Sequence, residues 1–261
     1  METESEYDLF YKERQERLPR FPLVYGAYAD LYRVRKLFSI IQALPNRAKL
    51  LEAGGGSCQY PIWIQHSFKS KELDITCLEP AKWPVDYANK YYRKKSFYNI
   101  HAVCSSLENC DFKEKFDFIY AIEVIEHTKS AQKFLQKCSS LLKRGGQIFL
   151  TTPNKNNYLK KLKFLKKKYT SFVNKNTQYS GLYSGPPIEE EHQSLQSTKE
   201  MKKMLSETGF IDTKFYRQSL LYPSEAIDKK SLLLPVIFLE EVVPVWLPFF
   251  SWGQIIVSRK K

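Results

Sequence analysis

Cysteine is sparse in this 261-residue sequence, and none of its five cysteines shows the C-x-x-C spacing that is typical of zinc and redox sites. A chain of this length also buries a core without needing disulfide bonds. Both features argue against a structural zinc site and predict reduced thiols in a cytoplasmic protein. The first ten residues, METESEYDLF, are acidic and lack the apolar segment of a secretory signal.

Long unbroken apolar runs are missing as well. The most apolar tract, residues 231–252, contains Glu240, Glu241 and three prolines. A membrane-spanning helix needs about 20 consecutive apolar residues. We therefore expect this tract to be a buried or interfacial, lid-like part of the fold.

Acidic residues and arginine are absent between Thr151 and Ile188, where eight lysines supply more than half of the formal net charge of +13. Apolar residues recur there at helical spacing, namely Tyr158, Leu162, Leu165, Tyr169 and Phe172. This pattern predicts an amphipathic helix with lysines on one face. Two interpretations stay open: residues 155–175 bind an anionic membrane surface, or the helix is solvated and docked on the domain.

Five short apolar runs alternate with helix-like segments after a helical N-terminal region. The runs are residues 48–53, 74–80, 98–104, 116–123 and 146–153. Strands that alternate with helices predict βαβ units and a parallel sheet covered on both faces. We expect a helical cap over residues 1–45 and one domain over residues 46–261, with an insertion at 154–192. The segment 130–146 reads as a helix that ends at Lys-Arg-Gly-Gly.

Glycine is scarce, yet three of the ten glycines are consecutive, at Gly54, Gly55 and Gly56. They follow the first predicted strand, where side-chain-free backbone turns tightly and lets a ligand approach. Glu79 closes the second strand, as an acid does in nucleotide-binding Rossmann-type folds. A dinucleotide site prefers G-x-G-x-x-G, but the position of its last glycine is Gln59. The pattern therefore favours a nucleotide-like ligand other than NAD.

The stretch FDFIYAIEVIEHTKSAQKFLQKCSSLLKRGGQIFLTTPN, residues 116–154, decides between ligands. It resembles the class I S-adenosylmethionine-dependent methyltransferases, in the branch with an E-V-x-E-H signature. That branch includes ubiquinone-biosynthesis O-methyltransferases and bacterial sugar or lipid methyltransferases. The resemblance covers residues 45–154 and resumes at 192–210. It implies an α/β, Rossmann-like, doubly wound, seven-stranded, mostly parallel sheet with helices on both faces, an antiparallel last strand and a helical insertion.

The same resemblance implies a set of residues that bind S-adenosylmethionine. These are Glu52, Gly54, Gly56, Glu79, Ser105, Ala121 and Ile122. Glu79 is expected to accept hydrogen bonds from the ribose hydroxyls, while Ala121 and Ile122 face the sulfonium. Ser105 stands where the family often has an acid beside adenine, and Cys58 replaces the usual last glycine. The competing interpretation is structural, with the glycines forming turns and the acids capping helices or lying on the surface.

Glu123, Glu126 and His127 form the expected catalytic centre, with His192 as a fourth member. Residues at i, i+3 and i+4 share one face of a turn, so the three side chains are expected to converge. In one hypothesis His127 is the general base for an acceptor hydroxyl. In a second, Glu123, Glu126, His127 and His192 hold Mg²⁺ or another divalent cation. In a third, Glu126 and His127, like His192, only cap helices.

Acceptor choice is expected to lie in the additions to the core. A basic amphipathic face beside an apolar tract suits a small or membrane-presented hydroxyl compound, such as a lipid-linked sugar or a quinone precursor. The protein would then be cytoplasmic, or peripheral at the inner face of a membrane. An RNA 2′-O-methyltransferase is the enzymatic alternative, disfavoured because the lysine stretch lacks arginine and an RNA-binding module. A non-catalytic binding subunit with the cofactor fold is the third hypothesis.

Overall fold

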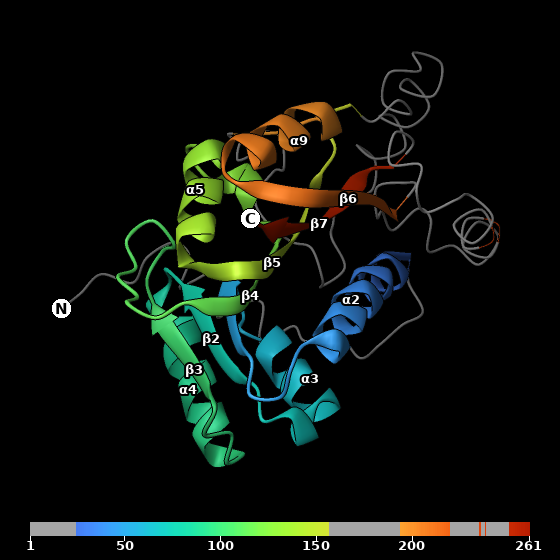
Figure 1. Cartoon of the computed structure of the whole chain (residues 1–261). Coiled ribbons are helices and arrows are strands. Elements are labelled where there is room, and N and C mark those ends of the chain that lie inside the picture. The colour runs from blue at the N-terminus through green and yellow to red at the C-terminus, as the bar shows by residue number, and fades with distance from the viewer. Residues whose placement is uncertain (1–24, 157–193, 220–234, 236–237, 239–250) are drawn as a thin grey trace.

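The computed structural model describes residues 25–156, 194–219, 235, 238 and 251–261 (Figure 1). Most of the expected lysine-rich insertion, His192 and most of the tract 231–252 lie outside these described residues. The same holds for residues 1–24 of the expected helical cap. The description below concerns the α/β domain and the helix that precedes it.

Seven strands of the described residues form one sheet, in the spatial order β3-β2-β1-β4-β5-β7-β6. Their bounds are β1 (Lys49–Ala53), β2 (Asp74–Glu79), β3 (Ile100–Cys104), β4 (Phe116–Ile122), β5 (Leu142–Pro153), β6 (Phe210–Ser219) and β7 (Gly253–Lys260). The first five strands are parallel to one another, and β7 runs antiparallel between β5 and β6. The expected fold class is confirmed.

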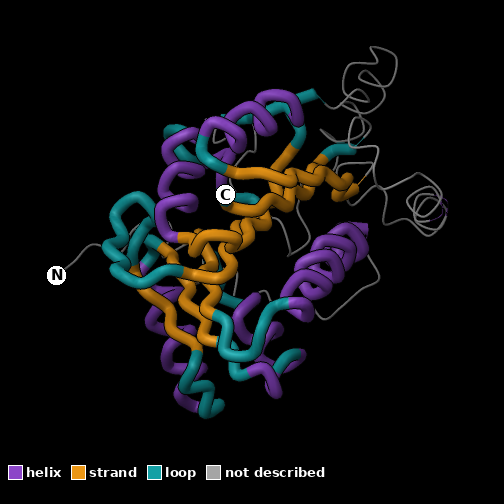
Figure 2. The backbone as a smooth tube through the Cα atoms, viewed as in Figure 1, coloured by secondary structure: helices purple, strands orange, loops and turns teal. Residues whose placement is uncertain are grey.

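Helices cover both faces of this sheet, as Figures 1 and 2 show. They are α2 (Tyr25–Ala43), α3 (Tyr60–Ser67), α4 (Lys82–Lys94), α5 (Ala131–Leu141) and α9 (Thr198–Glu207), with the short 3₁₀ turns η1 (Lys69–Lys71) and η2 (Ile125–His127). Buried side chains of α5 and α9 share one core with the sheet, and those of α2, α3 and α4 share the other. The sheet is therefore the middle of three layers.

Successive side chains of each strand alternate between the two faces of the sheet, which explains why there are two cores. In β1, Leu51 packs on the α5 side, whereas its neighbour Leu50 packs on the α2 side. In β4, Ile119 and Phe118 divide in the same way. Successive side chains of a strand point to opposite faces, so a run that is apolar throughout is buried on both.

The expected C-terminus of the helix in 130–146 is wrong. Helix α5 ends at Leu141, and Leu142 is already extended and buried in β5. Lys143 pairs with Asp117 of β4, and Gly145 takes a left-handed φ of +77° beside a register shift in the β4–β5 pairing. Lysine, arginine and two glycines thus form the bulged start of a strand here, because the buried Leu142 side chain and the Lys143 ion pair favour extension.

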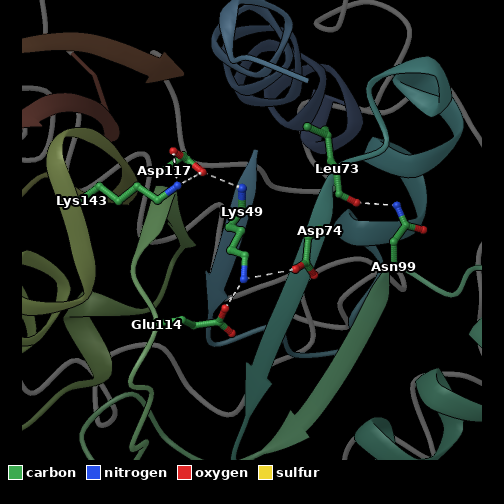
Figure 3. A network of polar contacts seen from close by, with 7 residues as sticks. All are labelled: Lys49, Leu73, Asp74, Asn99, Glu114, Asp117 and Lys143. Carbon is green, nitrogen blue, oxygen red and sulfur yellow. Dashed lines mark hydrogen bonds and ion pairs between the residues drawn. The ribbon is translucent and has the colours of Figure 1, made fainter. Parts of the chain in front are cut away.

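A network of charged side chains joins the amino ends of the strands (Figure 3). The Asp117 carboxylate accepts a hydrogen bond from the Lys49 backbone N–H and another from the Lys143 ammonium, each over 2.8 Å. The Lys49 ammonium contacts Glu114 and, at 3.9 Å, Asp74. This edge of the sheet is opposite to the one where the glycines lie.

Candidate functional site

The three glycines form a loop at the carboxyl end of β1. Gly54 and Gly56 take left-handed φ values of +77° and +54°, which residues with a Cβ adopt only at a cost. The N–H groups of Gly54 and Gly55 both donate to the Leu78 carbonyl oxygen, over 2.9 and 2.8 Å. The loop is therefore held against the end of β2.

Gly55 is required by packing. A Cβ atom at this position would lie 2.1 Å from the Cys77 sulfur and 3.3 Å from the Cys58 sulfur. Cys58, which stands in place of the family's last glycine, is fully buried and has a φ of +55°. Its carbonyl oxygen accepts a hydrogen bond from Tyr92 Oη at 2.8 Å. The sulfur atoms of Cys58 and Cys77 thus pack against one side of the loop at Gly55.

Glu79 ends β2 beside this loop and is buried. Its Oε2 accepts a hydrogen bond from Gly56 N over 2.8 Å, and its Oε1 accepts one from Ala81 N over 3.0 Å. A carboxylate offers about four acceptor positions. Two backbone donors therefore fix the orientation of the Glu79 carboxylate beside the loop.

Glu52, on β1, is buried below the glycine loop. Burial, reinforced by the Glu79 charge, raises the pKa of Glu52 to about 8, while hydrogen bonding to Cys77 acts in the opposite direction. Glu52 Oε2 and Tyr120 Oη have no hydrogen-bond partner among the described residues within normal bonding distance. Glu52 is thus a neutral acid at neutral pH, held directly below the glycine loop.

The other expected cofactor residues also lie at the carboxyl ends of strands. Ser105 follows β3, and its N–H donates to the Glu79 carbonyl oxygen over 3.1 Å. Ala121 is buried near the end of β4, and the half-buried Ile122 pairs with Thr151 of β5. The sheet therefore brings all seven expected residues to one edge, from β1, β2, β3 and β4.

The turn after β4 separates the expected catalytic trio. Glu123 takes a left-handed φ of +54°, and its N–H donates to both the carbonyl oxygen and Oγ1 of Thr151. Glu126 is completely buried and accepts a hydrogen bond from Thr152 Oγ1 over 2.9 Å. His127, next in the chain, is exposed.

Burial, reinforced by the Glu123 charge, raises the pKa of the Glu126 carboxyl well above its usual range. Within the described part of the chain, no three His, Cys, Asp or Glu side chains form a group that could hold a metal ion. The described residues therefore do not support the expected metal site: the Glu126 carboxyl is buried close enough to Glu123 for the Glu123 charge to raise its pKa, whereas His127 is exposed. The capping hypothesis is wrong, since Ser130 caps α5 by accepting from Lys133 N.

Sequence reasoning missed a buried polar cluster beside this turn. Arg33 of α2 and Gln218 of β6 are 6% and 4% exposed. Arg33 contacts Tyr60 and Glu123, and Gln218 contacts Arg33 and Glu123. No motif marks these residues, and neither stands out in the sequence, because α2 and β6 both contain several other polar side chains.

The chain ends that border the undescribed segments meet at this same edge. Ser194 N donates to the Glu126 carbonyl oxygen over 3.1 Å, and Lys155 N donates to the Gln196 carbonyl oxygen over 3.2 Å. Asn154 N donates to the Trp252 carbonyl oxygen over 2.8 Å. Both additions to the core therefore start and end at the carboxyl edge of the sheet.

These residues fit S-adenosylmethionine. The loop at Gly54–Gly56 presents backbone without side chains, since a Cβ at Gly54 or Gly55 would overlap Val124 or Cys77, and the Glu79 carboxylate is oriented beside it. Glu52 contributes a neutral buried carboxyl with an unpartnered oxygen among the described residues, near where a methionine portion would lie. The site thus combines a glycine loop after β1 with two buried acids, Glu52 on β1 and Glu79 at the end of β2. These features follow one another along the chain in the order expected for this ligand.

Comparisons with known proteins agree with this geometry. A family model described as "Methyltransferase domain" matches residues 26–214. A ubiquinone biosynthesis O-methyltransferase of Nitrobacter winogradskyi is 38% identical over 69 residues, which are 26% of this chain and 26% of that protein. One from Coxiella burnetii is 28% identical over 83 residues, 31% of this chain and 35% of that protein. The matched segments thus span about a quarter to a third of the curated relatives.

Solved structures share the fold. An S-adenosylmethionine-dependent methyltransferase of Thermotoga maritima superposes with a TM-score of 0.57 at 15% identity, covering 98% of each chain. Phosphoethanolamine N-methyltransferase 2 of Haemonchus contortus, in complex with S-adenosyl-L-methionine, gives a TM-score of 0.58 at 14% identity, covering 97% of this chain and 57% of that one. With the family model spanning residues 26–214, the chain belongs to the methyltransferase-domain family.

Proposed function

We propose that this methyltransferase methylates a hydroxyl oxygen of a small or membrane-presented acceptor, such as a quinone precursor or a lipid-linked sugar. The observation that carries the proposal is the 38% identity, over 69 residues, to a protein named for O-methylation in ubiquinone biosynthesis. Relatives from Bradyrhizobium and Rhodopseudomonas carry the same name.

The cofactor residues have supporting roles in this proposal. S-adenosylmethionine, when bound, supplies a methyl group that its sulfonium already activates. Glu79 holds the ribose, and Glu52, Gly54 and Gly56 line the methionine end. Ser105 borders the adenine, while Ala121 and Ile122 at the end of β4 border the reacting group. The main contribution of the protein is alignment and exclusion of water.

His127 takes the proton of the acceptor hydroxyl in this account. It is exposed, and it follows the strand whose end borders the cofactor loop. An imidazole is suited to proton transfer near neutral pH. Glu126 is buried and bonded to Thr152, so its role is to support the turn. His192 lies outside the described residues and stays a candidate partner of the acceptor.

A divalent cation does not fit the described part of this site. Glu126 is completely buried and bonded to Thr152, whereas His127 is exposed, and no three His, Cys, Asp or Glu side chains of the described residues form a group that could hold a metal ion. The chemistry proposed here has no metal-dependent step. Addition of EDTA is expected to leave the activity unchanged.

Residues 155–175 are proposed to hold the enzyme against an anionic membrane surface. Seven of the eight lysines between Thr151 and Ile188 fall within residues 155–168, and the eighth is Lys175. Positive charge of this density attracts anionic lipid headgroups. Among the described helices, none has both the length and the hydropathy to cross a bilayer.

The test is a methyl-transfer assay with labelled S-adenosylmethionine and three acceptors: a prenylated catechol, a polyprenyl-linked sugar and unmodified RNA. Lipid acceptors are presented in vesicles with either neutral or anionic phospholipid. We expect product from a lipid acceptor, at a higher rate on anionic vesicles, with the label on oxygen by mass spectrometry. Label in RNA alone would replace the proposal with 2′-O-methylation. Cofactor binding without transfer to any acceptor would favour the binding-subunit hypothesis.

A further inference from the structure

Helix α4 lies along β3, the outermost strand at one end of the sheet (Figure 1). Asn89, on the inner side of α4, holds the helix to this strand. Its Nδ2 donates to the Ala102 carbonyl oxygen over 2.8 Å, and its Oδ1 accepts from Ala102 N over 3.0 Å. The side chains of α4 that are buried against the domain are those of Pro84, Val85, Ala88 and Tyr92. These contacts fix the rotation of α4, so its opposite, outer face is held toward solvent.

The outer face of α4 is strongly basic. The helix contains one acid, Asp86, and four exposed basic side chains. These are Lys82, Lys90, Arg93 and Lys94. No other helix of the described residues has as large an excess of basic over acidic residues. The outer face is therefore complementary in charge to an anionic surface.

Aromatic side chains share this face with the lysines. Trp83 and Tyr87, one helical turn apart, stack with ring centroids 5.5 Å apart and ring planes inclined by 22°. Tyr87 is 48% exposed, and Tyr98, in the loop after α4, is 78% exposed. Tryptophan and tyrosine favour the headgroup level of a bilayer, which accommodates both an apolar ring and a polar tip. Aromatic rings beside lysines thus suit a surface of anionic lipid.

The aromatic half of the outer face lies at the carboxyl edge of the sheet. Helix α4 begins at Lys82, three residues after Glu79, which ends β2 beside the glycine loop. Trp83 and Tyr87 are therefore at the end of α4 that is close to the cofactor residues, and the more basic half of the helix lies toward the amino edge. A bilayer in contact with the outer face would lie beside the edge that carries the candidate site.

Nucleic acid is the other anionic partner with an extended surface, and the arrangement of the rings favours lipid. A protein that binds single strands stacks bases on open aromatic faces. Stacking of Trp83 on Tyr87 covers one face of each ring, and the Lys95 ammonium lies 5.8 Å from the centroid of the Tyr91 ring. These ring faces are thus partly occupied within the protein. Contact at headgroup level does not require open ring faces.

We propose that the outer face of α4 binds the surface of a membrane that contains anionic phospholipid. Trp83 and Tyr87 lie at headgroup level, and Lys90 and Lys94 pair with lipid phosphates. The bound orientation places the carboxyl edge of the sheet beside the bilayer, within reach of a membrane-presented acceptor. The benefit of this orientation rests on the proposed function, but the binding itself requires no acceptor and uses a surface distinct from residues 155–175.

The experiment is co-sedimentation of the full chain with vesicles of phosphatidylcholine, alone or mixed with phosphatidylglycerol. We expect the double variant Lys90→Gln, Lys94→Gln to bind the anionic vesicles roughly 30-fold more weakly, because each lysine near such a surface contributes about a factor of five. The matched control is Lys199→Gln, Lys202→Gln on α9, which removes the same charge from exposed positions on the other face of the sheet. Circular dichroism establishes that each variant is folded. Equal affinities of the two double variants would overturn the proposal.

Two further measurements separate this surface from the other proposals. Tyr87→Ser should weaken vesicle binding at every salt concentration, whereas the effect of the α4 lysine pair should diminish as salt screens the charges. Methyl transfer to a detergent-solubilised acceptor should be unchanged in the α4 variants, so a failure of the acceptor proposal leaves the vesicle result intact. Loss of binding to single-stranded RNA but not to vesicles in the lysine variant would make the face a nucleic-acid surface and contradict the proposal.

Discussion

The Glu79 carboxylate accepts a hydrogen bond from the Gly56 N–H over 2.8 Å, so the acid that ends β2 is bonded to the loop that follows β1. The same carboxylate accepts from Ala81 N, at the start of α4. One buried side chain thus joins three segments at the carboxyl edge of the sheet. The fixed orientation means that little ordering remains to be done when a ligand binds.

Gly55→Ala is expected to destabilise the protein by about 1–3 kcal/mol, because its Cβ would overlap the Cys77 sulfur at 2.1 Å. Urea denaturation measures the change. Cys77→Ala in the same chain removes the sulfur, so the double variant should recover part of the loss. Gly145→Ala, whose Cβ would meet nothing within 4 Å, measures for comparison the cost of a left-handed φ of +77° without overlap. A double variant Gly55→Ala, Cys77→Ala that is no more stable than Gly55→Ala would contradict this explanation.

Glu52→Gln is expected to change how stability depends on pH. The pKa of Glu52 is raised from 4.5 to about 8 by folding, so between these values the folded state holds a proton that the unfolded state has lost. Raising the pH through this window therefore destabilises the wild type, by at most roughly 1.4 kcal/mol per pH unit.

Glutamine cannot ionise, so Glu52→Gln lacks this dependence. Its stability relative to the wild type should increase from pH 5.5 to pH 8 and level off above. Denaturation in urea at several pH values gives the comparison. A constant difference between the two proteins across this range would show that Glu52 is not neutral in the folded state.

His127→Asn is expected to lower the rate of methyl transfer by roughly 10²- to 10⁴-fold, the usual contribution of a general base. The Kd for S-adenosylhomocysteine should not change, because the proposed role of His127 is toward the acceptor hydroxyl and not toward the cofactor. His101→Asn, at an exposed position of β3, is the matched control. An unchanged rate for His127→Asn would remove this residue from the mechanism.

The sequence predicted the parts of this molecule that are local along the chain. The first five strands were recognisable from short apolar runs, and the glycine loop and Glu79 from their places at the ends of two such runs. Ser197 and Glu200 form a capping box at the start of α9, another feature that is local along the chain. These features depend on backbone conformation and on neighbours a few residues away.

What could not be predicted depends on contacts between distant segments. Arg33 and Gln218 belong to an early helix and a late strand, and only the fold places both beside Glu123. The helix boundary at Leu141 was missed because the Lys143 partner, Asp117, lies on another strand. Glu126 was expected to face His127, but its burial against Thr152 is set by β5.

Asp117→Asn tests whether the opposite edge of the sheet serves stability alone. The carboxylate accepts from Lys49 N and from the Lys143 ammonium (Figure 3), at the amino ends of strands whose carboxyl ends border the glycine loop. Losing the charge should lower the free energy of unfolding by about 1–2 kcal/mol. The Kd for S-adenosylhomocysteine should stay that of the wild type. A large loss of affinity in the folded variant would show that the two edges are coupled.

The most direct test of the account is calorimetric titration with S-adenosylhomocysteine of the wild type, of Glu79→Ala and of the exposed control Glu108→Ala. We expect micromolar binding at one site per chain for the wild type and the control. For Glu79→Ala we expect affinity weakened roughly 30- to 100-fold, since both ribose acceptors and the loop anchor are lost. Absence of binding by the folded wild type, or full affinity of Glu79→Ala, would contradict the cofactor site described here.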